Sequence, residues 1–243
     1  MKNSSRRSKR IIAAAAASAV VAVPFLSGCN SDADNSNNES MDVVATTTQI
    51  CDYAKEIAKD NVKLTCLLAP NASAHDHEMT PKQMNALSKA KLFMVNGVDL
   101  EHFLDSAVDA SGFKGTMVVT SGILTANEVK DSSAAAKNDK DKPYTVDRGD
   151  QKVNVALWPF APEPGEQPEF EYDPHVWTSP KNAKVQVHNI GKALEKADPD
   201  HKDAYIQNTK DYEKKLDELD KWVNDSIVSV PESQRVLLSL IHI

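Results

Sequence analysis

VKLTCLLAPNASAHDHEMTP, residues 62–81, contains a strand pattern, a polar loop and a helix start in succession. Its first seven residues, Val62–Leu68, are apolar enough to form a buried strand. At the other end, Thr80 and Pro81 are an N-cap residue and a first-turn proline, which together predict the start of a helix. The loop between them holds two histidines and two carboxylates within residues 75–78. This stretch therefore predicts one strand–loop–helix unit with potential metal ligands in its loop.

The same alternation of strand and helix continues on both sides of this unit. We predict further strands at 42–47, 92–95 and 117–120, and helices at 49–59 (after Thr48 as N-cap) and 99–110. Such alternation predicts an α/β fold with a parallel sheet and helices on both faces. In these sheets ligands bind at the carboxyl ends of the strands, where the loop after Leu68 lies.

Residues 130–170 break this pattern, because Lys, Asp, Ser, Pro and Glu dominate them. We interpret them as an irregular excursion with one short strand or hairpin at Val153–Trp158. Two helices follow, one from Ser179-Pro180 to about Ala197 and one at about Asp203–Ser229. The second would be about 40 Å long. We therefore expect a lobe at 42–200 and a linking helix at 201–230.

The N-terminus predicts export and membrane attachment. Residues 1–28 combine a basic start with an apolar run and end in Leu26-Ser27-Gly28, directly before Cys29. This is similar to a bacterial lipoprotein signal, in which the cysteine is lipidated. An ordinary signal peptide and an uncleaved anchor are the alternatives. Residues 29–41 are polar and Ser/Asn-rich, as in a flexible tether.

The charge of the chain indicates which partners it favours, and its cysteines predict a disulfide. Removal of residues 1–28 would take away five basic residues and leave 23 basic against 35 acidic residues, a net charge of −12. Such a surface favours cations and argues against nucleic acid as a partner. Cys51 and Cys66 would return to the same end of a helix–strand unit, and we predict a disulfide between them. A zinc-binding thiolate pair is the alternative, although zinc sites prefer closer spacing.

Two histidines are the candidate metal ligands. His75 lies in the loop described above, and His175 lies in a second short segment, Tyr172–Trp177, just before a helix. Imidazole nitrogen is a good ligand for Zn²⁺ and other late first-row ions, so we predict that both bind one divalent ion. A solvated surface loop is the simpler alternative. We interpret three other histidines as solvated: His102, His188 and His201.

Taken together, these motifs resemble the solute-binding lipoproteins of bacterial zinc and manganese ABC importers. The resemblance runs from Val43 to Leu237 and rests on Cys29, the loop 75–81, the segment 96–101 (NGVDLE) and the segment 173–177 (DPHVW). It implies two α/β lobes joined by one long helix, with Zn²⁺ or Mn²⁺ between them. It also implies His75 and His175 as ligands. The implied protein is an extracytoplasmic, lipid-anchored monomer that delivers its ion to a membrane permease.

The chain departs from that family at two places. Ala74 and His77 occupy positions where the family has proline and an aromatic residue, so His77 is a ligand, a partner of a ligand or an aromatic substitute. The other two family ligands are missing, and we expect them in a second lobe that would begin at 231–243. The last six residues, 238–243, match the translation of a sequencing adaptor, so we interpret them as an artefact and give His242 no weight.

Two other function classes stay open from the residues alone. An anchored metallohydrolase would use His75, His77 and His175 with Glu78 as base, but the chain has no His-Glu-x-x-His motif. A surface adhesin would hold a structural metal and use residues 130–170 for contact. The choice between zinc and manganese depends on the missing ligands.

Overall fold

The computed structural model describes residues 40–75, 77–131, 133–162 and 165–235. Contacts divide the chain into two units, residues 1–38 and 39–243, and all of the described residues belong to the second. The predicted signal segment, the predicted lipidation site at Cys29 and the final residues 236–243 lie outside the described residues.

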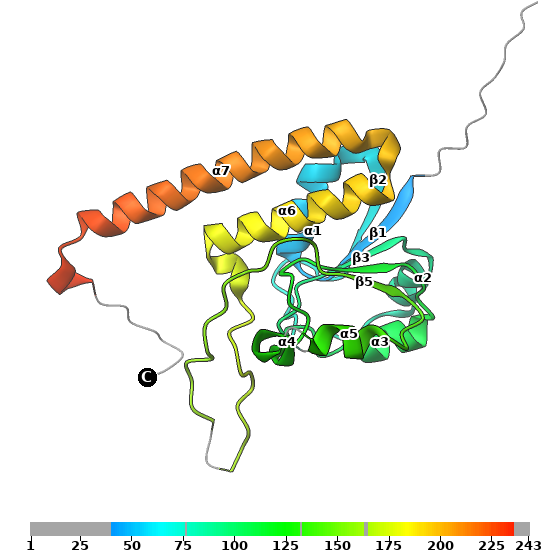
Figure 1. Cartoon of the computed structure of the whole chain (residues 1–243), viewed down its shortest axis with the longest axis horizontal. Helices are drawn as coiled ribbons and strands as arrows, with labels where there is room; N and C mark the ends of the chain where they lie inside the picture. Colours follow the sequence, from blue (N-terminus) through cyan, green and yellow to red (C-terminus); the bar gives the residue numbers. More distant parts are fainter. Residues whose placement is uncertain (1–39, 76, 132, 163–164, 236–243) are drawn as a thin grey trace, which may run out of the picture. The chain divides into compact units, whose positions relative to one another are not determined.

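Five parallel strands form one sheet in the order β2-β1-β3-β4-β5 (Figure 1). The strands are β1 (Met41–Ala45), β2 (Val62–Cys66), β3 (Leu92–Val95), β4 (Thr116–Val119) and β5 (Thr145–Asp147). The predicted parallel sheet is thus confirmed. The place of the fifth strand is a correction, because we had expected the one short strand or hairpin of residues 130–170 at Val153–Trp158. Thr145–Asp147 pairs with β4 in register from Thr116 onward.

Helices cover both faces of the sheet, as predicted (Figure 1). They are α1 (Thr48–Ala58), α2 (Pro81–Lys89), α3 (Leu104–Ser111), α4 (Ala126–Lys130), α5 (Ala134–Asp139), α6 (Pro180–Ala197) and α7 (Lys202–Ser229). Side chains alternate between the faces along each strand. Val43 packs among α1, α6 and α7, whereas its neighbour Val44 packs among α2 and α3. The core therefore has two layers, one on each face.

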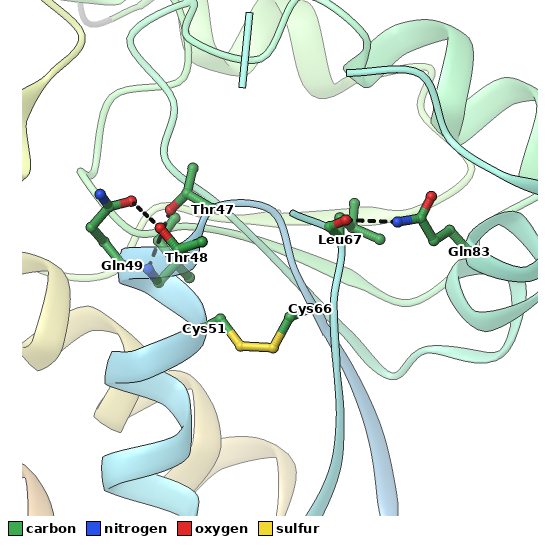
Figure 2. The surroundings of a disulfide bond; sticks show 8 residues. Thr47, Thr48, Gln49, Cys51, Cys66, Leu67 and Gln83 are labelled. Carbon is green, nitrogen blue, oxygen red and sulfur yellow. Dashed lines mark hydrogen bonds between the residues drawn. A yellow bond between two sulfur atoms is a disulfide. The ribbon is translucent and has the colours of Figure 1, made fainter. Parts of the chain in front are cut away.

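Capping hydrogen bonds fix the first turns of α1 and α2. Thr47, rather than the predicted Thr48, caps α1 and accepts a hydrogen bond from the Ile50 amide. Thr80 caps α2 together with Gln83, whose side chain also donates to the Leu67 carbonyl at 2.7 Å (Figure 2). The loop that carries His75 is thereby tied at both of its ends.

A disulfide joins α1 to the end of β2. The Cα atoms of Cys51 and Cys66 lie 5.7 Å apart, and Figure 2 shows the bond between the two side chains. It fastens the first helix to the strand that leads into the histidine loop.

The later part of the chain differs from the predicted pattern. Val153–Trp158 forms no strand, and only an isolated antiparallel bridge joins Leu157 to Tyr172. The 28-residue helix α7 buries Tyr205 and Leu216, but Leu219 and Ile227 near its end are exposed. No helix among the described residues is long and apolar enough to span a bilayer.

Candidate metal site

His75 and His175, which are separated by 100 residues, meet at the carboxyl edge of the sheet. Their Nε2 atoms lie 3.4 Å apart. Two nitrogens that each bind a tetrahedral Zn²⁺ at about 2.0–2.1 Å would lie about 3.3–3.4 Å from each other. Both side chains are about one-third exposed, at 29 and 32%. The pair is therefore spaced and accessible as two ligands of one ion.

Asp173 orients the ring of His175. Its Oδ1 atom lies 2.8 Å from His175 Nδ1 and also accepts a hydrogen bond from the His175 amide at 2.9 Å. A proton on Nδ1 leaves the lone pair of Nε2 free for a metal, and a carboxylate in this position also increases the basicity of the ligand. We had not identified Asp173, although an aspartate two residues before the histidine was visible in the motif.

Asn96 holds the backbone directly before His175. Its Nδ2 atom donates to the Pro174 carbonyl at 3.0 Å, and its Oδ1 atom accepts from Gln186 Nε2 at 2.9 Å. Gln186 also donates to Thr120 Oγ1, at the end of β4. All of these side chains are buried. The ends of β3 and β4 therefore position His175 through a buried network of hydrogen bonds.

Glu101 fixes the turn that carries Asn96. Its carboxylate accepts hydrogen bonds from the Asn96 and Gly97 amides and from Thr46 Oγ1. Burial raises the pKa of Glu101, although these hydrogen bonds oppose the shift. The turn includes Val98 with φ +55°, a strained conformation for a β-branched residue. Our predicted helix at 99–110 is therefore wrong at its start: α3 begins at Leu104, because the preceding residues form this turn.

The ring of His75 is held mainly by packing. Its centroid lies 5.4 Å from that of buried Phe170, and its amide donates to Ser73 Oγ at 3.1 Å. Its Nδ1 atom is buried and has no hydrogen-bond partner in the described part of the chain, and the carboxylate of Glu169 lies 3.7 Å from it. The two predicted ligands thus differ: among the described residues, a carboxylate lies within hydrogen-bond distance of His175 Nδ1 but not of His75 Nδ1.

Aromatic rings form a wall around the histidine pair. Trp158 and Trp177 lie 6.0 and 5.4 Å from the ring of His175, and Phe170 lies 5.1 Å from Trp158. Phe170 and Trp158 come from the segment that we had interpreted as an excursion. Such a wall limits water access, which strengthens charge–dipole interactions inside the site.

Among the other described histidines, His102 lies near the pair, with its ring centroid 6.5 Å from that of His75. His77 packs edge-on against Phe103, and burial lowers its pKa, which fits the aromatic-substitute interpretation. His102 is exposed beside Phe170. The predicted solvation of His188 is wrong, because its side chain is only 20% exposed and contacts Asp150 and Glu213. His201 lies 2.8 Å from Asp198. Among the described residues, no three His, Cys, Asp or Glu side chains gather as a metal site.

Comparison with known proteins places this geometry in a family. A family model described as "Zinc-uptake complex component A periplasmic" matches residues 43–240. The manganese-binding lipoprotein MntA of Bacillus subtilis is 29% identical over 215 residues, which cover 88% of this chain and 59% of that protein. The manganese ABC transporter substrate-binding lipoprotein scaA of Streptococcus gordonii is also 29% identical, over 88% of this chain and 61% of its own length. The first relative is thus named as a metal-binding lipoprotein, and the second as the substrate-binding lipoprotein of an ABC transporter.

Solved structures agree with this match. The periplasmic zinc-binding protein TroA from Treponema pallidum superposes with a TM-score of 0.58 at 25% identity, over 80% of this chain and 58% of that one. The metal-dependent lipoprotein YcdH from Bacillus subtilis gives a TM-score of 0.53 at 27% identity, over 75% of this chain and 54% of that one. This chain spans about three-fifths of the length of the curated relatives that it matches.

Proposed function

Because this chain belongs to the family of periplasmic zinc-uptake complex component A, we propose that it captures a divalent metal ion outside the cytoplasm and delivers it to an ABC-type importer. The observation that carries the proposal is the 3.4 Å separation of His75 Nε2 and His175 Nε2. That spacing suits two ligands on one ion. In this function the ion is cargo, and the chain performs no bond chemistry.

The two histidines act as neutral donors in this proposal. Asp173 accepts the Nδ1 proton of His175, so the Nε2 lone pair is directed at the ion. Asn96 keeps Pro174 in place, and so limits the motion of His175 away from His75. Two ligands fill half of a tetrahedral set, and further ligands from solvent or from other protein groups complete it.

Zn²⁺ and Mn²⁺ are the proposed cargo ions. Paired imidazoles favour Zn²⁺ over Mn²⁺, because the affinity of nitrogen ligands for divalent ions is higher for zinc than for manganese. Carboxylate ligands suit Mn²⁺ better. The relatives named above for manganese support the second choice. Parallel titrations with each ion decide between them.

We also propose that Cys29 is lipidated and holds the mature monomer at the membrane surface. The relatives named as lipoproteins support this location. A Cys29→Ala variant should move from the membrane fraction to the soluble fraction of cells. A variant that stays membrane-bound would contradict lipid attachment.

Calorimetric titration with Zn²⁺ tests the metal-binding proposal. We expect His75→Ala and His175→Ala each to weaken binding at least tenfold, because each removes one of two ligands. His201→Ala is the matched control, since it removes a histidine that is one-third exposed and paired with a different aspartate. Equal affinity of all three variants and the unmutated protein would refute the proposal.

A further inference from the structure

The Nδ1 atom of His75 lacks a hydrogen-bond partner among the described residues although it is buried. When Nε2 of a neutral imidazole binds a metal, the ring proton sits on Nδ1. A buried N–H group without an acceptor costs about 1–3 kcal/mol. Metal binding by His75 therefore creates a need for an acceptor at this atom.

Glu169 is placed to meet that need. Its Oε1 atom lies 3.7 Å from His75 Nδ1, which is about 0.5–1 Å beyond hydrogen-bond distance. Its side chain is 55% exposed, so it has room to rotate, whereas the adjacent Phe170 is 5% exposed and packs on the ring of His75. The Glu169 side chain can therefore change its rotamer, while the backbone beside it is held by the packing of Phe170.

Backbone hydrogen bonds also hold the segment next to Glu169 in place. The Trp158 amide donates to the Glu171 carbonyl at 3.0 Å, and the Asp173 amide donates to the Ala156 carbonyl at 2.9 Å. These bonds pair residues 156–158 with residues 171–173, directly beside Glu169. A rotation of the Glu169 side chain can therefore close the gap without a change in the backbone.

We propose that Glu169 is a positioning residue for metal binding, accepting the Nδ1 proton of His75 when Nε2 binds the ion. It would do for His75 what Asp173 does for His175, and each ligand would then have its own carboxylate. The inference rests on the proposed metal-binding function. It adds that Glu169, about 95 residues after the loop of His75 in the sequence, changes its side-chain position when the ion binds.

Zinc titration of Glu169→Ala and Glu169→Gln tests this role. Loss of such a carboxylate typically costs 10–100-fold in metal affinity, so we expect at least a tenfold loss for the alanine variant. The glutamine variant keeps an acceptor oxygen without the charge, and its loss should be smaller. Glu166→Ala, which removes an exposed carboxylate from the same segment, is the control and should bind as the unmutated protein does.

Two further measurements separate positioning from a merely structural role. The melting temperature of the metal-free protein should not change in either Glu169 variant, because the Glu169 side chain makes no hydrogen bond to the residues that the structure describes. In nitrogen-15 NMR spectra of the zinc-loaded protein, the His75 Nδ1 proton should exchange with water faster in Glu169→Ala. A crystal structure of the zinc-loaded protein with a Glu169 oxygen bound to the ion itself would overturn the positioning role.

The outcomes also distinguish this inference from the function on which it rests. If His75→Ala weakens zinc binding and Glu169→Ala does not, only the role of Glu169 fails. If neither variant weakens zinc binding, the proposed function fails.

Discussion

Replacement of Asp173 by alanine should weaken metal binding without removing a ligand. The substitution deletes the acceptor 2.8 Å from His175 Nδ1 and the acceptor 2.9 Å from the His175 amide. The ring then loses both its preferred tautomer and its fixed direction. Loss of a carboxylate behind a metal-binding histidine typically costs 10–100-fold in affinity, which is about 1.4–2.7 kcal/mol. Asp173→Asn keeps an acceptor oxygen, so its loss should lie at the lower end.

Calorimetric titration with Zn²⁺ measures both variants against one matched control. Asp150→Ala also removes a carboxylate 2.9 Å from a histidine, but that histidine is His188, which bridges α6 and α7. We expect the control to bind zinc as the unmutated protein does. An Asp173→Ala affinity within threefold of the unmutated protein would show that the ring orientation seen here is unimportant for binding.

Three stability predictions follow from the fold, each measured by urea unfolding. Removal of the disulfide by Cys51→Ser with Cys66→Ser, which are 15 residues apart, should lower the free energy of unfolding by about 3 kcal/mol; an unchanged midpoint would contradict this. Gln186→Leu breaks two buried hydrogen bonds and should cost about 2–3 kcal/mol, whereas a cost below 1 kcal/mol would show that the network relaxes. Burial and, less strongly, the charge of Asp52 raise the pKa of Tyr53 to about 12. As pH rises, the Tyr53 hydroxyl therefore loses its proton in the unfolded chain before it does so in the folded protein. The stability that the protonated hydroxyl contributes is complete below about pH 10 and is lost as pH rises through 12. The loss should reach about 1.4 kcal/mol by pH 11, and Tyr53→Phe should lessen the decline; an equal decline in that variant would contradict this assignment.

The strands with clear apolar runs were predictable, whereas the fifth was not. Val43 and Phe93 lie in continuous apolar segments, as is typical of strands in a sheet that has helices on both of its faces. Thr145–Asp147 has only three residues, two of them polar, and none of the three is fully buried. It becomes a strand by pairing with β4, and local sequence carries no signal for such pairing.

The start of α3 shows the same limit at the site. Residues 99–103 fit a helical pattern, but the Glu101 carboxylate accepts hydrogen bonds from the Asn96 and Gly97 amides, and α3 begins only at Leu104. Similarly, His75 and His175 were predicted to be ligands from motifs, whereas Glu169 was not singled out. Its place beside His75 depends on long-range contacts such as the bridge between Leu157 and Tyr172, which is a tertiary effect.

The crystal structure of the zinc-loaded protein, with the anomalous signal of zinc recorded, tests metal binding most directly. We predict one anomalous peak at about 2.0–2.1 Å from both His75 Nε2 and His175 Nε2. A peak bound to only one of these atoms, or one located elsewhere on the chain, would contradict the proposed site.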